Sequence, residues 1–264
     1  MNPIMMEWIA AHALLLWALL LLLAMMIGDL AWQHNVRWHR RTAGLGQIAV
    51  VMRWQVGVFL LLALLLLFAA IVLALFGRYT ALLAGFDTAL AESLHNQLPL
   101  PVLRMVAKVT HLGDRVWLAL AAAIVLIVLL LRRHGRLALA WSIALLGIVP
   151  INGSLKAALR RVRPLHDHGF IIEPGWSFPS GHAFGAVVFY GMLAYSSLRL
   201  SPRCHRAIIA AAVLLIGVVG ISRILLQVHY FSDVLAGYTL GAAWLVLCIG
   251  IMERLQLPPR RTLS

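Results

Sequence analysis

The sequence predicts an all-α membrane protein, a polytopic bundle of about seven spanning helices, and three observations support that prediction. Of its 264 residues, 62% are hydrophobic and only 12% are charged, whereas soluble domains are about 25% charged. The mean hydropathy is +0.92. Long apolar runs such as residues 14–26 (LLLWALLLLLAMM) recur along the chain. This composition excludes a water-soluble globule, a disordered chain and a disulfide-stapled secreted module.

Seven segments come close to the roughly 20 apolar residues that a helix needs to cross a bilayer. They are residues 8–30, 54–77, 116–131, 137–157, 182–198, 207–225 and 233–252. The third and the sixth are short and run into polar residues, as expected where a helix ends at a functional surface. No basic residue precedes the first segment and no small-residue cleavage site follows it, so we expect a retained helix. Glycines spaced four apart, at 181/185 and 237/241, predict close helix packing.

Segment 78–115 is too polar to form another span. Residues 86–90 and 102–109 have helical spacing, and the LPLP motif at 98–101 separates them. Two short helices lying at the outer membrane interface fit this pattern. Three acidic residues of this segment are expected to be interfacial polar contacts: Asp87, Glu92 and Asp114.

The arginines predict the orientation, because short loops rich in Lys and Arg stay in the cytoplasm. Four segments with several arginines alternate correctly with seven spans: 31–53, 132–136, 199–206 and 253–264. The N-terminus is therefore expected outside and the C-terminus inside, in a bacterial inner (cytoplasmic) membrane. This topology accounts for most of the net charge of +13, with contact to anionic lipids of the bilayer as a secondary role. No nucleic-acid partner is needed to explain it.

Nine basic residues fall on the opposite side, which would face the periplasm, and five of them are informative: Lys156, Arg160, Arg161, Arg163 and Arg223. Unpaired charge is expensive near the apolar part of a bilayer, so charged residues at span ends indicate function. Their common sign calls for an anionic partner. Three stretches on this side carry that argument further.

The first stretch is Lys156-AALRRV-Arg163-Pro164. Lys156 and Arg163 are two helical turns apart, which predicts that both project from one helix face, and Pro164 is expected to end the helix. The planar fork of arginine and the compact charge of lysine both suit phosphate oxygens. Arg160 and Arg161 either join them or are solvated beside lipid headgroups.

The second stretch, Phe178-Pro-Ser-Gly-His182, directly precedes a span. Ser180 is a suitable N-cap. Free backbone N–H groups and the positive end of the helix dipole form an anion site there, and Gly181 allows a ligand to approach the backbone. A single histidine such as His182 in this position is more often structural, and gains weight only from the other stretches.

The third stretch runs from Ser222-Arg223 to His229 and Asp233. His229 and Asp233 are four apart, the spacing at which helical side chains meet. Asp233 can accept a hydrogen bond from one ring nitrogen and leave the other as an oriented nucleophile or base. The His229–Asp233 pair alone is weak evidence for a catalytic site. Together, however, the three stretches place two histidines, a carboxylate and several cations at one membrane face.

These stretches resemble the three-part signature of the type 2 phosphatidic acid phosphatase (PAP2) family. The matching patterns are Lys156-x6-Arg163-Pro164, Pro179-Ser180-Gly181-His182 and Ser222-Arg223-x5-His229-x3-Asp233. The resemblance covers about residues 54–252 and implies a six-span helical core, to which 8–30 adds an extra N-terminal transmembrane helix. Three regions follow: 1–53 with the extra helix and a cytoplasmic loop, a catalytic membrane domain at 54–252, and a cytoplasmic tail at 253–264.

The resemblance also implies a metal-independent phosphatase that uses no cofactor and acts on lipid phosphates or diphosphates at the outer face. His229 would be the nucleophile that forms a phosphohistidine, Asp233 its orienting partner and His182 the general acid. The phosphate ligands would be Lys156, Arg163, Ser180, Gly181 and Arg223. The family includes soluble acid phosphatases and vanadium haloperoxidases, but seven spans favour a lipid substrate. Vanadate is expected to inhibit as a phosphoryl mimic.

Several alternatives stay open at this level. Undecaprenyl diphosphate or a broad range of phospholipid phosphates is favoured over phosphatidylglycerol phosphate, phosphatidate and lipid A phosphate as substrate. A lipid phosphotransferase could use the same phosphohistidine, and a multispan lipid transporter or binding protein is a candidate from another class. His166 and His168 resemble a metal pair, but two ligands do not make a zinc site. The sequence does not address the oligomeric state.

Overall fold

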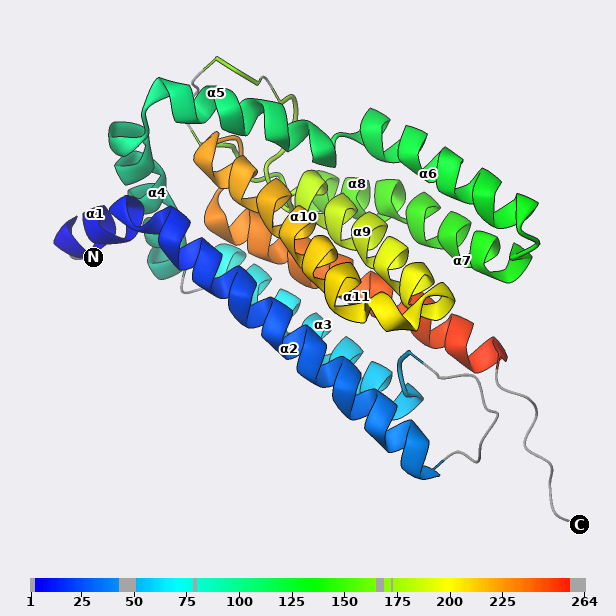
Figure 1. Ribbon diagram of the computed structural model, residues 1–264. Coiled ribbons are helices and arrows are strands. Elements are labelled where there is room, and N and C mark those ends of the chain that lie inside the picture. Colours follow the sequence, from blue (N-terminus) through cyan, green and yellow to red (C-terminus); the bar gives the residue numbers. More distant parts are fainter. Residues whose placement is uncertain (1–2, 43–50, 78–79, 165–168, 172, 257–264) are drawn as a thin grey trace, which may run out of the picture.

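The computed structural model describes residues 3–42, 51–77, 80–164, 169–171 and 173–256 (Figure 1). Its elements are α1 (Pro3–Ala11), α2 (Ala13–Thr42), α3 (Trp54–Phe76), α4 (Thr80–Gln97), α5 (Leu100–Val109), η1 (Thr110–Gly113), α6 (Arg115–Leu131), α7 (Gly135–Leu146), α8 (Ile148–Leu159), α9 (Gly181–Leu200), η2 (Pro202–Cys204), α10 (His205–Leu225) and α11 (Phe231–Gln256). No strand occurs within these ranges. The predicted all-α class is confirmed.

Six helical segments of the described chain are long and apolar enough to span a membrane. The predicted span 116–131 corresponds to α6, which has 17 residues and passes that test only together with α5 and η1, from which it is bent by 43°. The bend lies at Asp114, whose extended backbone separates the two helices. The described chain has up to seven spans if α5, η1 and α6 count as one bent span, which Figure 1 shows beside α10.

The predicted first span at 8–30 is displaced. The spanning segment is Ala13–Trp38, and residues 8–11 belong to α1, which a break at His12 separates from α2. The apolar composition continues through this break, so hydropathy alone does not reveal that the helix changes direction. α1 packs on α4, where Ala10 contacts the cluster of Leu90 and Leu94.

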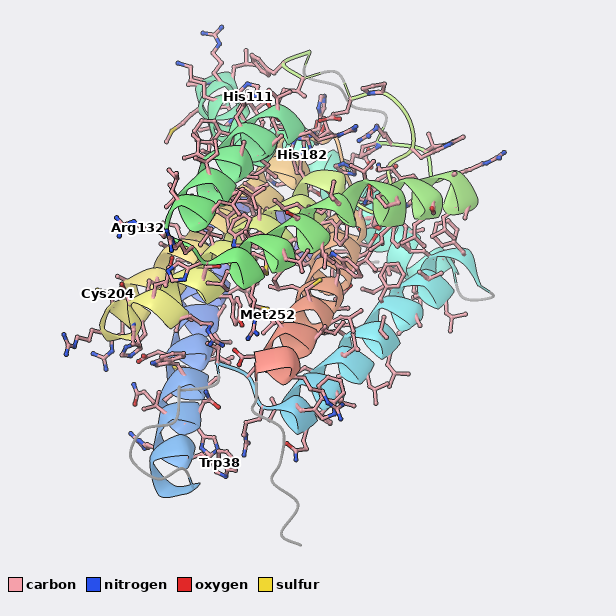
Figure 2. All side chains as sticks on the ribbon, turned by 90° about the vertical axis from the view of Figure 1, so that its right-hand side faces the viewer. Trp38, His111, Arg132, His182, Cys204 and Met252 are labelled. Atoms are coloured by element: carbon pink, nitrogen blue, oxygen red, sulfur yellow. The ribbon has the colours of Figure 1, made fainter. Side chains whose placement is uncertain are left out.

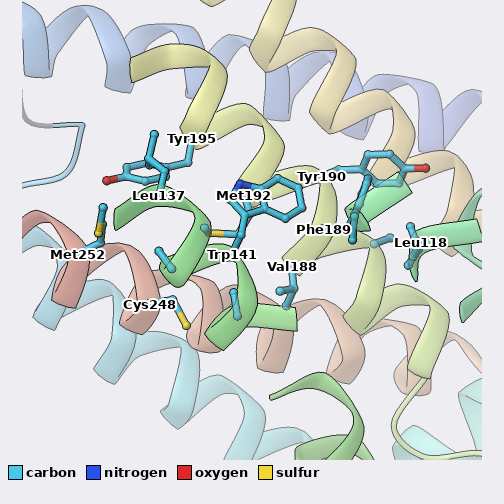
Figure 3. Packing of buried hydrophobic residues seen from close by; sticks show 14 of the residues in the cluster. Leu118, Leu137, Trp141, Val188, Phe189, Tyr190, Met192, Tyr195, Cys248 and Met252 are labelled. Atoms are coloured by element: carbon cyan, nitrogen blue, oxygen red, sulfur yellow. The ribbon is translucent and has the colours of Figure 1, made fainter. Parts of the chain in front are cut away.

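α9 is the central helix, with α10 and α11 packed against it, α3 against α11 and α2 against α10 (Figure 1). Apolar side chains gain little from leaving lipid for the interior of a bundle, so close packing and interhelical hydrogen bonds hold such helices together. The core contains Trp141, Val188 and Met192, all fully buried (Figure 3). The equally buried Phe184 belongs to the same cluster. The indole Nε1 of Trp141 donates to Ser196 Oγ at 2.8 Å, which satisfies its polar group.

Two glycines bring α11 directly against α9. A Cβ atom at Gly237 would lie 2.6 Å from the Ser180 carbonyl oxygen, and one at Gly241 would lie 3.0 Å from that of Phe184. The predicted close packing at 237/241 is confirmed. The same approach lets the Ser180 amide donate to the Asp233 carbonyl at 3.0 Å, so small residues align the start of α9 with the start of α11.

The two ends of the bundle differ in chemistry. Figure 2 shows His111 and His182 at one end, and Cys204 and Trp38 toward the other. At the second end the buried Glu253 accepts hydrogen bonds from Tyr195 and Arg199, each at 3.0 Å. The arginine-bearing turns after α6 and α9 lie at that second end as well (Figure 1). This separation agrees with the predicted two-sided arrangement, whose orientation in a membrane stays a prediction.

Candidate active site

A cavity of about 570 Å³ opens at the end of the bundle that holds His182. Its polar lining includes Lys156, Arg163, Glu173, His182 and His229, together with Arg115 and Asn152. Apolar side chains of α6 and of α7–α8 continue the same wall: Leu118, Ala119, Ala122, Leu145, Ile148 and Val149. Of the predicted site residues, Gly181 also lines the cavity, whereas Ser180, Arg223 and Asp233 are fully buried behind it.

His229 lies in the loop between α10 and α11, and Asp233 in the first turn of α11. The two side chains lie near each other as predicted, but the predicted reason is wrong, because His229 precedes the helix and the two residues do not share a helical turn. Asp233 Oδ2 accepts from the Tyr230 amide at 2.9 Å, which holds the loop against the helix start. His229 Nδ1 then lies 3.6 Å from the same oxygen.

Ser177 connects these two residues and was not predicted. Its hydroxyl donates to Asp233 Oδ2 at 2.5 Å, and its Oγ lies 3.3 Å from His229 Nδ1. A hydroxyl has one proton to donate, so the second contact needs a proton on Nδ1. Arg163 Nη1 donates toward His229 Nε2 at 3.3 Å, which also needs Nε2 unprotonated. Both contacts favour the tautomer in which Nε2 is the free nucleophilic nitrogen.

The surroundings of His229 favour its neutral form. Burial lowers the pKa of its imidazole to about 3, with the cations Arg163 and Arg223 acting in the same direction and Asp233 opposing them. A buried cation loses its hydration, whereas a neutral ring does not. His229 is therefore unprotonated at neutral pH, as an attacking nitrogen requires.

Lys156 and Arg163 converge on the cavity, although not for the predicted reason. α8 ends at Leu159, and Arg160 has a left-handed backbone with φ of 45°, so Arg163 is not on the helix that carries Lys156. The chain instead turns back along the cavity. Lys156 Nζ donates to the Trp176 carbonyl, and Arg163 Nη1 donates to that of Val228 at 2.6 Å.

Arg223 meets an acidic residue that sequence reasoning missed. Its Nη2 donates to Glu173 Oε1 at 2.5 Å and its Nη1 to Thr110 Oγ1 at 2.8 Å. The same Glu173 oxygen lies 3.7 Å from His182 Nδ1. A carboxylate thus lies among the predicted phosphate ligands. Glu173 stands in a loop outside the three sequence patterns, so nothing in their spacing pointed to it.

His182, the predicted general acid, contacts Asp114. Its Nε2 lies 2.9 Å from Asp114 Oδ1, and His111 Nδ1 lies 2.6 Å from Asp114 Oδ2. The expectation that Asp114 is only an interfacial contact is wrong, because the bend before α6 points its carboxylate at the site. Ser180 caps α9 as predicted and accepts from the Ala183 amide at 3.5 Å.

The two remaining basic residues of the first stretch, Arg160 and Arg161, lie in different surroundings. Arg160 is exposed, and its Nε donates to the Ala157 carbonyl in the last turn of α8 at 2.9 Å. Arg161 is paired with Asp87 and Asp233 behind the cavity. Asp87 is 1% exposed, so its expected interfacial role is wrong. His166 and His168 lie outside the described residues. Within the part of the chain that is described, no three His, Cys, Asp or Glu side chains are grouped as metal ligands.

Residues 135–257 match the PAP2 superfamily. This stretch contains every residue of the three patterns. The chain belongs to the PAP2 superfamily. The resemblance inferred from the motifs is thereby confirmed. The prediction of a multi-pass membrane protein is confirmed as well, by the six apolar helices of the described chain.

Relatives of this PAP2 chain carry the names of lipid phosphatases. It is 37% identical over 111 residues to phosphatidylglycerophosphatase B of Bacillus subtilis, which covers 40% of this chain and 53% of that protein. The match therefore spans about half the length of that relative. Lipid A 1-phosphatase of Rhizobium johnstonii is 27% identical over 239 residues, with 82% of this chain and 86% of that protein covered.

The PAP2 bundle is also similar to a solved structure. This is a transmembrane PAP2-type phosphatidylglycerolphosphate phosphatase from Bacillus subtilis, with a TM-score of 0.69 and 26% identity. The similarity covers 98% of that chain but 75% of this one. A quarter of this PAP2 protein thus lies outside the shared architecture.

Proposed function

We propose that this PAP2 chain hydrolyses the phosphate group of a membrane lipid. One observation carries the proposal: a single cavity joins Lys156, Arg163, His182 and His229 to the apolar wall formed by α6 and α7–α8. A lipid phosphate has the same division into a charged head and an apolar tail. A small soluble phosphate ester would not need the apolar wall.

In the first step, Nε2 of His229 attacks phosphorus, and the bond from phosphorus to the leaving oxygen breaks as the N–P bond of a phosphohistidine forms. His182 gives its proton to the leaving oxygen. Lys156 and Arg163 line the cavity and neutralise the charge that spreads over the phosphoryl oxygens, aided by the Gly181 amide. Arg223 and Ser180 lie behind the cavity wall and support the same charge from there. Phosphoryl transfer depends mainly on such positioning and charge neutralisation.

In the second step, water attacks the phosphohistidine. His182 accepts a proton from that water, the N–P bond breaks and inorganic phosphate leaves. Asp233 and Ser177 keep Nδ1 of His229 protonated in both steps, so that Nε2 stays the reacting nitrogen. The protons donated and recovered by His182 balance over one cycle.

The relatives' names make phosphatidylglycerophosphate and a lipid A phosphate the first substrates to test, ahead of the undecaprenyl diphosphate that the sequence alone favoured. We place the reaction at the periplasmic face of the bacterial inner membrane, because the arginine-bearing turns occupy the end of the bundle opposite the cavity. Undecaprenyl diphosphate and phosphatidate complete the panel.

The test is phosphate release by detergent-solubilised protein in EDTA from each of these four lipids. We expect release by the unmodified chain, its loss in His229→Ala, and inhibition by vanadate. His134→Ala is the matched control, since His134 is exposed at the opposite end of the bundle. Phosphate transferred to a second lipid instead of water would indicate a phosphotransferase. Lipid binding without turnover in every variant would indicate a binding or transport protein.

A further inference from the structure

Arg161 lies behind the cavity wall between two buried carboxylates. Its Nη1 is 2.6 Å from Asp233 Oδ1 and its Nη2 is 2.8 Å from Asp87 Oδ2. The side chain of Arg161 is 13% exposed and both carboxylates are 0% exposed. The Tyr230 ring covers the guanidinium, with its centroid 4.4 Å from Cζ. Arg161 does not line the cavity, so it is not placed to bind a substrate phosphate.

Asp87 reaches this site from α4, far from α11 in the sequence. Its Oδ1 accepts from the Ser232 amide at 3.1 Å, and its Oδ2 accepts from the Ser232 hydroxyl. Arg161 Nη1 also donates to that hydroxyl oxygen at 2.7 Å. The hydrogen bonds therefore join Asp87, Ser232 and Arg161 into one buried network beside Asp233.

α4 is held firmly enough to serve as an anchor. Leu90 and Leu94 are buried in a cluster with Ala10 of α1 and Leu225 of α10. Gln227, which precedes His229 by two residues, donates to the Ala91 carbonyl of α4. The position of Asp87 thus depends on interhelical packing and not on its own helix alone.

Each oxygen of Asp233 has a separate task. Oδ2 accepts from Ser177 and Tyr230 and faces His229, while Oδ1 is bound by Arg161. A carboxylate fixed at both oxygens cannot rotate about its terminal bond. Burial lowers the pKa of Arg161, but the two carboxylates outweigh burial and raise it overall, so the guanidinium stays charged.

We propose that Asp87 and Arg161 are a positioning pair, which orients Asp233, partly neutralises its charge and thereby sets the reactivity of His229. This inference rests on the hydrolysis proposed above. Arg161 acts directly on Asp233, and Asp87 acts through Arg161. Neither residue touches the substrate.

The charges around His229 make the inference measurable. Asp233 of α11 favours the imidazolium form, whereas Arg163 after α8 and Arg223 of α10 disfavour it, and Ser177 of the preceding loop is neutral. Loss of Arg161 leaves the charge of Asp233 uncompensated, so His229 is protonated more easily. Loss of the Asp87 charge has the opposite sign, because Arg161 then neutralises Asp233 more fully.

The test compares kcat, KM and the pH dependence of kcat/KM for Arg161→Gln, Arg161→Lys and Asp87→Asn. The pH profiles are corrected for the ionisation of the lipid phosphate itself. We expect kcat of Arg161→Gln to fall roughly 10- to 100-fold, the range typical for loss of a group that orients a metal ligand, with KM unchanged. The acid limb of its kcat/KM profile, where the rate falls as His229 is protonated, should move to higher pH by about one unit. Arg161→Lys should have the acid limb at the same pH as the unmodified chain. It should recover only part of kcat, because lysine lacks the fork that binds both carboxylates. Asp87→Asn should not raise the limb.

Arg160→Gln is the matched control, since Arg160 is the exposed neighbour of Arg161. It should match the unmodified chain. Equal kcat in all variants, or limbs that move in the same direction in Arg161→Gln and Asp87→Asn, would overturn the inference while leaving the proposed hydrolysis intact. Absence of His229-dependent release in the unmodified chain would overturn both. If Arg161→Gln does not fold in detergent, the other two variants decide. A kcat of Arg161→Lys equal to that of the unmodified chain, or a raised acid limb in Asp87→Asn, would overturn the inference.

Discussion

Ser177 and Asp233 are joined by a 2.5 Å hydrogen bond in which the serine hydroxyl donates to the carboxylate. The bond leaves Ser177 Oγ free to accept from Nδ1 of His229, 3.3 Å away. The orientation of the proposed nucleophile thus depends on a serine as well as on the carboxylate of the motif. This arrangement places the proton of the neutral His229 ring on Nδ1.

Removal of that hydroxyl should slow the chemical step. We expect kcat of Ser177→Ala to fall roughly 10-fold, which corresponds to the loss of a hydrogen bond worth about 1.4 kcal/mol. KM should change little, because Ser177 does not line the cavity. Ser154→Ala is the control, since Ser154 is exposed and donates to Pro150 of its own helix. Unchanged kcat in Ser177→Ala would contradict the assigned role.

The contact between His182 and Asp114 predicts a dependence on the leaving group. An alcohol leaving group needs a proton more than a phosphate leaving group does. His182→Ala should therefore reduce hydrolysis of a lipid monophosphate more than that of a lipid diphosphate, and Asp114→Asn should do the same to a smaller extent. Initial rates on phosphatidate and undecaprenyl diphosphate measure the ratio. Equal losses on both lipids would count against His182 as the acid.

Arg163 should be sensitive even to a conservative change. It donates to the Val228 carbonyl and toward His229 from one guanidinium nitrogen while its Nε donates to Gly175. A lysine cannot reproduce this geometry. We expect Arg163→Lys to lower kcat/KM on the order of 100-fold, and Arg160→Lys to leave it unchanged. Comparable activity of the two variants would show that only net charge matters at Arg163.

Acid should destabilise the protein through His229. Its pKa in the folded protein is about 3, below the value of about 6.5 expected in the unfolded chain. Between these values the unfolded chain binds the extra proton, so the contribution of His229 to stability is complete above pH 6.5 and is lost as the pH falls toward 3. Thermal unfolding in detergent from pH 7 to 4 should show a smaller decline in His229→Gln than in the unmodified chain. Parallel declines would refute the assignment.

Gly237 should tolerate no side chain. A Cβ atom there would lie 2.6 Å from a backbone oxygen of α9, which cannot move aside easily. We expect Gly237→Ala to lower the stability by about 1–3 kcal/mol and to reduce activity by displacing Asp233 from Ser180. Gly135→Ala is the control, because nothing lies within 4 Å of a Cβ atom at that position. Thermal unfolding and phosphate release would be measured together, and equal behaviour of the two variants would exclude tight packing at Gly237.

The sequence by itself predicted the membrane class, the all-α fold, the family and the close approach at Gly237 and Gly241. These features follow from local quantities, because apolar length, glycine spacing and motif residues can be read along the chain. It also placed Lys156, Arg163 and His229 at one site, and all three line the cavity, whereas the predicted ligands Arg223 and Ser180 lie behind it. It misplaced the first span, since hydropathy does not register the break at His12.

Only the tertiary structure decided how the polar groups are paired. Ser177, Asp87 and Glu173 meet the motif residues across distances in sequence that no local pattern encodes, and Arg161 could be assigned to the buried side only when α4 and α11 were placed together. The helix that carries Lys156 also ends before Arg163, against the two-turn argument. The physical reason is that a buried charge takes whichever partner the packed helices bring within reach, and that choice belongs to the fold as a whole.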